Sequence, residues 1–145
     1  MSDLLLKNEC IEKLNTNRFL VTFGDGSLFH EWHVDNVNFF PIDLLDKHNV
    51  KNNVFIVTFN QFDNYGDTKY VSLSKEFNSS DNKSIYIEYL DKTGRTLLKE
   101  GYHGCFITEV HFTPNDYKVD KVKQVKLVVR YNFGCLEQHN EKQSE

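Results

Sequence analysis

Hydrophobic and polar residues alternate almost strictly between positions 125 and 133. The odd positions are apolar and the even positions are mostly polar. Successive side chains of a β-strand point to opposite faces of a sheet, so this pattern predicts a strand with one buried and one wetter face. We expect residues 121–133 to form the last strand, and residues 134–145 to form a flexible polar tail. The apolar positions are Val125, Leu127, Val129, Tyr131 and Phe133.

A hairpin is predicted near the start of the chain. Residues 18–23 alternate in the same way, and Gly24 and Gly26 flank a single aspartate. Glycine adopts positive φ at little cost, so this segment is typical of a tight turn. We expect residues 28–34 to return as the partner strand. Its apolar side would carry Leu28, His30, Trp32 and Val34.

The middle of the chain predicts a central strand and a helix. Residues 54–59 are apolar on both faces, which is typical of a strand covered on both sides. Residues 37–41 predict the end of a strand or an irregular edge, because Pro41 cannot continue a ladder of hydrogen bonds. Residues 42–53 look polar and turn-like. Residues 68–77 favour a short helix that covers an open face of the sheet.

Two further strands are expected before the last one. Residues 85–90 predict a strand, and a turn follows in which Gly94 takes the left-handed conformation. Residues 95–112 predict the return. Gly101 and Gly104 interrupt it, which indicates a bulge or a bend.

Residues 3–14 predict an N-terminal helix, with Leu4, Ile11 and Leu14 on one face and Cys10 beside them. A helix of this length is marginal alone, so we expect it to dock on its own sheet or on a neighbouring subunit. The expected fold is therefore mainly β: a single-domain antiparallel β-sandwich or barrel over residues 1–133. It would carry the N-terminal helix and one short covering helix.

Composition agrees with this fold and narrows the function. The chain has 145 residues, 14% aromatic residues and a formal net charge of −4. Aromatic side chains pack well across strands, and an acidic balance does not favour binding to polyanions. Cys10, Cys105 and Cys135 are expected to be free thiols in a reducing compartment, although a bridge between the last two remains open. With neither a signal peptide nor a membrane span expected, the protein should be soluble and made in the cytoplasm.

Candidate chemistry is sparse. In a strand, His30 and His33 would point to opposite faces and could not share a metal ion. Nothing in the spacing of His103 and Cys105 supplies the third group that a Cys–His nucleophile needs. We therefore expect no catalytic residue, no cofactor and no metal ligand. The strand aromatics suit core packing, and a stacking platform for sugars or bases remains the alternative.

The order of these elements resembles the inner tail-tube family of contractile-tailed phages, a family that extends to the inner-tube proteins of type VI secretion. A short helix leads into a first strand of the form N-x-F-x-V, and an apolar run ending in Pro41 follows. Residues 54–59 are similar to the family's central strand, and a helical segment comes next in both. The segments that carry the resemblance are residues 17–23, 37–41, 54–59, 85–91, 106–112, the Pro-Asn-Asp turn after them, and 125–133.

The resemblance implies an assembly role. Six subunits would form a ring, rings would stack into a tube that passes DNA without gripping it, and the tail sheath and baseplate would be partners in a virion tail. Open sheet edges suit such pairing. Only residues 42–53 stand where the family has a long hairpin, which favours a baseplate-proximal or tail-completion piece. A monomeric β-sandwich that binds carbohydrate or protein is the alternative. The predicted subunit-interface residues are Leu4, Leu5, Ile11, Leu14, Phe39 and Phe40.

Overall fold

The computed structural model describes residues 12–42, 44–45 and 53–139. In this part the chain forms two four-stranded sheets, one α-helix and one short 3-10 helix. The expected mainly β, antiparallel fold is confirmed. The elements are β1 (Phe19–Phe23), η1 (Glu31–His33), β2 (Val34–Phe39), β3 (Val54–Asn60), α2 (Asp67–Ser79), β4 (Ile85–Leu90), β5 (Thr96–His103), β6 (Phe106–Phe112), β7 (Gln124–Arg130) and β8 (Phe133–His139).

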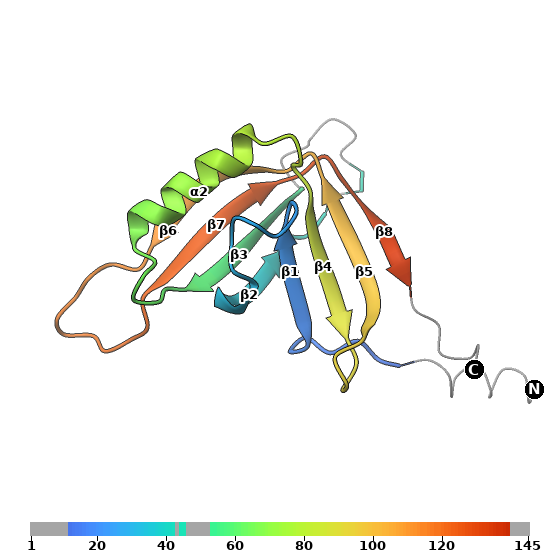
Figure 1. The fold of residues 1–145 in the computed structure, drawn as a ribbon, viewed down its shortest axis with the longest axis horizontal. Helices are drawn as coiled ribbons and strands as arrows, with labels where there is room; N and C mark the ends of the chain where they lie inside the picture. The colour runs from blue at the N-terminus through green and yellow to red at the C-terminus, as the bar shows by residue number, and fades with distance from the viewer. Residues whose placement is uncertain (1–11, 43, 46–52, 140–145) are drawn as a thin grey trace, which may run out of the picture.

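The two sheets have the strand orders β1-β4-β5-β8 and β2-β3-β7-β6, and all neighbouring strands run antiparallel. We call them sheet A and sheet B. Figure 1 shows that their strands run at a wide angle to each other, with α2 lying along β6. The core lies between the sheets, because the buried side chains of both sheets belong to one cluster.

Sheet B supplies the centre of the core. β3 lies between β2 and β7, as expected for a strand that is apolar on both faces. In β7 the alternation also holds: Val125, Leu127 and Val129 are 0% exposed, whereas Lys126 is exposed. The predicted inward face is confirmed for β7 and for Tyr131, which is 5% exposed, but not for Phe133, which is 57% exposed and begins β8.

Helix α2 closes the core beside β6. It buries Tyr70, Ser74 and Phe77, and the ring of Phe77 meets that of Phe23 at a centroid distance of 5.6 Å. The Ser74 hydroxyl donates a hydrogen bond to the Tyr70 carbonyl at 2.7 Å, so this buried polar group is satisfied within the helix. The predicted covering helix is thus confirmed.

Gly104 marks a crossing between the sheets rather than the expected bulge within one strand. The chain leaves sheet A after β5 and enters sheet B with β6. Gly104 has φ +69°, and a Cβ there would overlap the side chain of Asn132. Asn132 lies at the reverse crossing from β7 to β8, and its N–H donates to the His103 carbonyl at 2.9 Å. The two crossings therefore brace each other.

The predicted hairpin over residues 18–34 is wrong. β1 pairs with β4, and residues 28–34 form η1 and the first residue of β2 instead of a partner strand. Phe29 is 5% exposed and packs on Phe23 at 4.5 Å, while Trp32 is 79% exposed. Phe29, which the alternation placed on the polar face, packs into the core, so the alternating pattern of a strand does not apply to this segment.

The predicted flexible tail is also wrong as far as residue 139. Phe133–His139 forms β8, which pairs with β5 at one side of sheet A. An edge strand tolerates polar and exposed side chains, and this hid β8 in the sequence. Residues 140–145 and most of the predicted helix over 3–14 lie outside the described residues. Residues 12–14, which are described, are not helical.

Candidate functional site

Sheet edges are one feature that could join this chain to another. Within the described residues, β1 and β8 end sheet A, and β2 and β6 end sheet B. Each has one side without a neighbouring strand in the fold. The backbone N–H and C=O groups on such a side can pair with another chain. On β6, α2 occupies part of that side, because the Asn78 side chain donates to the Ile107 carbonyl at 2.9 Å and accepts from the Ile107 N–H at 2.8 Å. Of the described strands, β1, β2 and β8 are therefore the candidate edges for assembly.

Three of the predicted interface residues are described, and all are partly exposed. Phe39 and Phe40 lie at the end of β2 and are 43% and 47% exposed, and Leu14 precedes β1 at 47%. The ring of Phe39 also packs inward on Phe55 at 5.2 Å. Leu4, Leu5 and Ile11 lie outside the described residues, so the interface as a whole stays a prediction.

The exposed apolar surface continues beyond β2. Ile42 is 53% exposed and Leu44 is 87% exposed. We call Phe39, Phe40, Ile42 and Leu44 the β2 patch. Residues 42–53 were expected to form a polar turn, so the second half of this patch was not predicted. The apolar residues Ile42 and Leu44, which stand two positions apart after Pro41, could have indicated this surface.

A second exposed apolar surface lies on the loop between β6 and β7, residues 113–123. This loop projects away from both sheets (Figure 1) and carries Tyr117, Val119 and Val122, all of them exposed. Thr113 N–H donates to the Gln124 carbonyl at 3.0 Å, which closes the base of the loop. The last strand was expected to begin at residue 121, but β7 begins at Gln124, so this projecting loop was not predicted.

An aromatic cluster surrounds η1. His30 and His33 stack at a centroid distance of 4.9 Å, so the prediction that they point to opposite faces of a strand is wrong. His33 also stacks on Phe62 at 4.3 Å, and Phe62 and Trp32 are largely exposed. Burial lowers the pKa of His33, and His30 and Lys69 lower it further. This cluster is an open aromatic surface that could stack on a partner.

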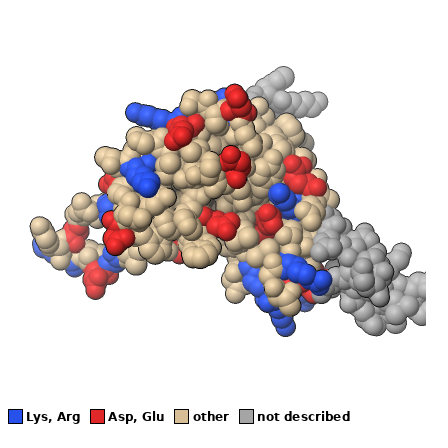
Figure 2. All heavy atoms as spheres, viewed as in Figure 1, with Lys and Arg blue, Asp and Glu red and all other residues tan. Residues whose placement is uncertain are grey.

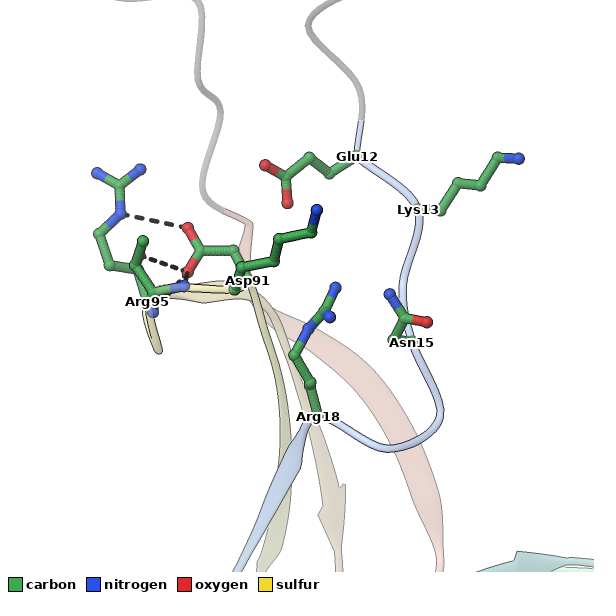
Figure 3. A pocket seen from close by; sticks show the side chains of 8 residues that line it. Glu12, Lys13, Asn15, Arg18, Asp91 and Arg95 are labelled. Atoms are coloured by element: carbon green, nitrogen blue, oxygen red, sulfur yellow. Dashed lines mark hydrogen bonds and ion pairs between the residues drawn. The ribbon is translucent and has the colours of Figure 1, made fainter.

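A shallow pocket of about 560 Å³ lies at the turn between β4 and β5 (Figure 3). Asp91 accepts hydrogen bonds from the Thr93 hydroxyl at 2.7 Å and from the Arg95 N–H at 2.9 Å. These bonds lower the pKa of Asp91 to about 2. Asp91 is 5% exposed and serves the turn, so it is unsuited to acid–base chemistry. The lining residues are Glu12, Lys13, Asn15, Arg18, Asp91, Lys92, Thr93 and Arg95.

Cys105 is poorly placed to act as a nucleophile. It is free and fully buried, and its thiol donates to the Tyr102 carbonyl at 3.1 Å. Burial raises the pKa of the thiol to about 12, so the neutral form persists at any physiological pH. Cys135 is also free, and it is exposed on β8. The predicted free state of these two thiols is confirmed, and Cys10 lies outside the described residues.

Charge is mixed over the face drawn in Figure 2, where acidic and basic side chains alternate and basic ones gather near the β4–β5 turn. Lys13, Arg18, Lys92 and Arg95 line the pocket at that turn. No helix in the described part of the chain is both long and apolar enough to span a membrane. The surface therefore offers assembly edges and apolar patches more clearly than a catalytic centre.

Comparison with known proteins finds similarity in structure alone. No protein-family model and no curated protein matches the chain. A chain in the structure of the sheath/tube terminator of an extracellular contractile injection system, PVC, matches with a TM-score of 0.64 and 14% identity. That match covers 88% of this chain and 99% of the other.

Two more structures are similar. One is the tube-terminating cap of the anti-feeding prophage, with a TM-score of 0.64, 14% identity, and coverage of 88% of this chain and 92% of the other. The other is the PVC sheath-tube complex, with a TM-score of 0.60, 14% identity, and coverage of 90% and 96%. At this identity the matches establish a shared fold, and these neighbours are parts of contractile injection systems.

Proposed function

We propose that this chain is a structural subunit of the tail tube of a contractile, phage-like particle, and that it acts by assembly rather than by catalysis. The observation that carries the proposal is the fold match over nearly the whole length of a chain from a sheath/tube terminator structure. A shared fold alone does not establish a function. The surfaces of this chain supply the additional support.

The β2 patch and the sheet edges suit self-association. Phe40 and Ile42 are about half exposed, beside an edge strand with one side unpaired within the described chain. Apolar area exposed next to unpaired backbone groups favours the addition of a strand from a second subunit. A repeated contact of this kind closes into a ring when its rotation divides a full turn.

The position we favour is the end of a tube. Two of the similar structures are described as a terminator and as a terminating cap. Only residues 42–53 separate Pro41 from β3, where the inner-tube family that the sequence resembles has a long ring-stacking hairpin. A subunit that stacks on one side only has less need of this hairpin. Sheath and baseplate proteins are the expected partners in a virion tail.

A ring of six subunits with a channel for DNA is the finer form of this proposal. It rests on the family resemblance of the sequence. The formal net charge of −4 is compatible with a channel that lets DNA pass without binding its phosphates.

Light scattering of purified variants tests the proposal. We expect the unaltered chain to form large species with a fixed number of subunits, and Phe40→Glu to reduce them to monomers. Phe62→Glu is the matched control, because Phe62 is similarly exposed, at 50%, but lies in the aromatic cluster around η1. If both variants assembled like the unaltered chain, the β2 patch would not be the contact.

A monomeric binding module is the second candidate, and the aromatic cluster favours it. Trp32 is 79% exposed and Phe62 is 50% exposed beside stacked imidazoles, a surface suited to the face of a sugar ring. The same variants separate the two functions. A binding module would remain monomeric, would lose glycan binding in Phe62→Glu, and would keep it in Phe40→Glu.

A further inference from the structure

Three side chains of different chemistry converge on the outer face of sheet A. His103 ends β5, and Cys135 and Glu137 lie two residues apart on β8. His103 Nε2 is 3.2 Å from Glu137 Oε1, and Cys135 Sγ is 3.1 Å from Glu137 Oε2. Within residues 12–42, 44–45 and 53–139, this is the one group whose imidazole, thiol and carboxylate atoms all lie within 4.8 Å of one another.

The strand register explains the convergence. Gly101 pairs with Cys135, and His103 pairs with Phe133, so these residues share one face of the sheet. Cys135 and Glu137 alternate onto that same face. The His103 and Glu137 side chains are 22% and 28% exposed, which leaves an approach from solvent.

Ser84 orients the imidazole. Its hydroxyl lies 2.8 Å from His103 Nδ1, and the Ser84 carbonyl is held by the N–H of Gly24 at 2.7 Å. When Ser84 Oγ accepts a hydrogen bond from Nδ1–H, the lone pair on Nε2 is available to bind a metal ion in place of the contact with Glu137. Metal-binding histidines are oriented in this way by a partner on the other ring nitrogen.

Gly101 makes room for the carboxylate. A Cβ at this position would lie 2.7 Å from Glu137 Cγ and 2.8 Å from its Oε1. The Glu137 side chain therefore lies directly over the glycine on its way to His103. A residue with a side chain at position 101 would occupy the space that the Glu137 side chain needs.

We propose that His103, Cys135 and Glu137 form a binding site for a divalent zinc ion, with Nε2, Sγ and one carboxylate oxygen as its three protein ligands. One nitrogen, one sulfur and one oxygen donor form a borderline-soft set that suits Zn²⁺ better than Mg²⁺ or Ca²⁺. Binding displaces the thiol proton to solvent, and the thiolate takes its place as a ligand. The Glu137 contacts to the other two groups are exchanged for bonds to the metal.

The fourth position of a tetrahedral site would be open to water or to a group from outside the chain. β8 is an edge strand, so a neighbouring subunit could approach from this side. The site does not depend on assembly, because all three ligands come from one chain. It can therefore be tested on the monomer or the oligomer.

Metal titration of the untagged chain tests the site. We expect Zn²⁺ to bind with one ion per chain and to raise the melting temperature, since a ligand that binds the folded state stabilises it. Co²⁺ should give a near-ultraviolet thiolate-to-metal band that Zn²⁺ removes. The absence of this band, or of Zn²⁺ binding at micromolar concentration, would overturn the proposal.

Variants identify the ligands. Cys135→Ser and Glu137→Gln should abolish the band and the saturable binding. The matched control is His111→Gln, because His111 and Glu109 form a similar exposed pair at 2.7 Å with no thiol in the same group. Equal loss of binding in the control, or none in the ligand variants, would show that the metal binds elsewhere.

Two variants that leave all three ligands in place test the geometry. Ser84→Ala removes the partner of Nδ1, and Gly101→Ala displaces the Glu137 side chain. Each should weaken Zn²⁺ binding on the order of 10–100-fold, as other losses of outer-shell support do. Unchanged affinity in both would contradict the arrangement described here, whatever the outcome for the ligand variants.

Discussion

The middle strands of sheet B and the β8 side of sheet A differ in how deeply their side chains are buried. In sheet B, the middle strands β3 and β7 carry six inward side chains that are 0% exposed. In sheet A, β8 is exposed at every residue from 133 to 138, and β5 buries Leu97 and Gly101 among mostly half-buried neighbours. The six buried side chains of sheet B are Phe55, Val57, Phe59, Val125, Leu127 and Val129.

This difference indicates where stability and surface chemistry reside. A substitution in the middle of sheet B removes area that nothing else can bury. A substitution at the β8 side of sheet A changes what the surface can bind and leaves the core intact. The same kind of change should therefore cost much stability in the middle of sheet B and little on β8.

Leu127→Asp should have the largest effect. It places a carboxylate at a position that is 0% exposed, in the middle of β7. Burial of an unpaired charge is expected to remove at least about 4 kcal/mol from a domain whose total stability is on the order of 5–15 kcal/mol. We expect no cooperative thermal transition in circular dichroism.

The neighbouring Lys126→Asp is the control, because Lys126 is exposed on the other face of the same strand. It should melt within about 1 kcal/mol of the unaltered chain. A folded Leu127→Asp variant with unchanged melting would mean that the inward face of β7 has been assigned incorrectly.

Gly104→Ala should have the next largest effect, since Gly104 joins the two sheets. Its positive φ and the overlap of a Cβ with Asn132 should together cost about 2–4 kcal/mol in urea unfolding. Gly94→Ala is matched to it, because Gly94 has φ +89° and open space around a Cβ. Gly94→Ala should cost only about 1–2 kcal/mol. Equal losses would argue against the braced crossings.

Asp91 makes one turn of sheet A sensitive to acid. Its folded pKa of about 2 lies below the ordinary value of 3.8, because Thr93 and Arg95 donate hydrogen bonds to the carboxylate. The stability that it contributes is present above pH 4 and is lost as the pH falls toward 2. The melting temperatures of the unaltered chain and Asp91→Asn should therefore differ at pH 7 and converge toward pH 2. A constant difference would show that the charge of Asp91 is not involved.

Leu136→Asp on β8 should have the smallest effect on stability. Leu136 is 59% exposed, so the free energy of unfolding should change by no more than about 0.5 kcal/mol. The contrast with Leu127→Asp is the direct test of the two-sheet comparison. A large loss of stability here would mean that β8 belongs to the core.

Local patterns predicted the elements whose burial follows a simple period. The alternation of β7, the two-sided apolar run of β3, the helix before β4 and the left-handed Gly94 are all present in the structure. The strand predicted over residues 28–34 is wrong because Phe29, on the face expected to be polar, packs into a core built from distant parts of the chain. β8 was not predicted, because an edge strand does not require an apolar pattern.

The surface sites were less accessible to sequence reasoning. Phe39 and Phe40 belong to the apolar run ending in Pro41 that carries part of the family resemblance, and the structure leaves both partly exposed. His103 and Cys135 come together only through the pairing of β5 with β8, and no spacing along the chain encodes that pairing. Sites built across strands distant in sequence require the fold.

Negative-stain imaging of the purified chain over a range of concentrations tests the central claim most directly. We predict closed rings of uniform diameter, alone or in short stacks, at the higher concentrations. Single particles of the size of one domain at every concentration would contradict an assembly role and would favour the monomeric binding module.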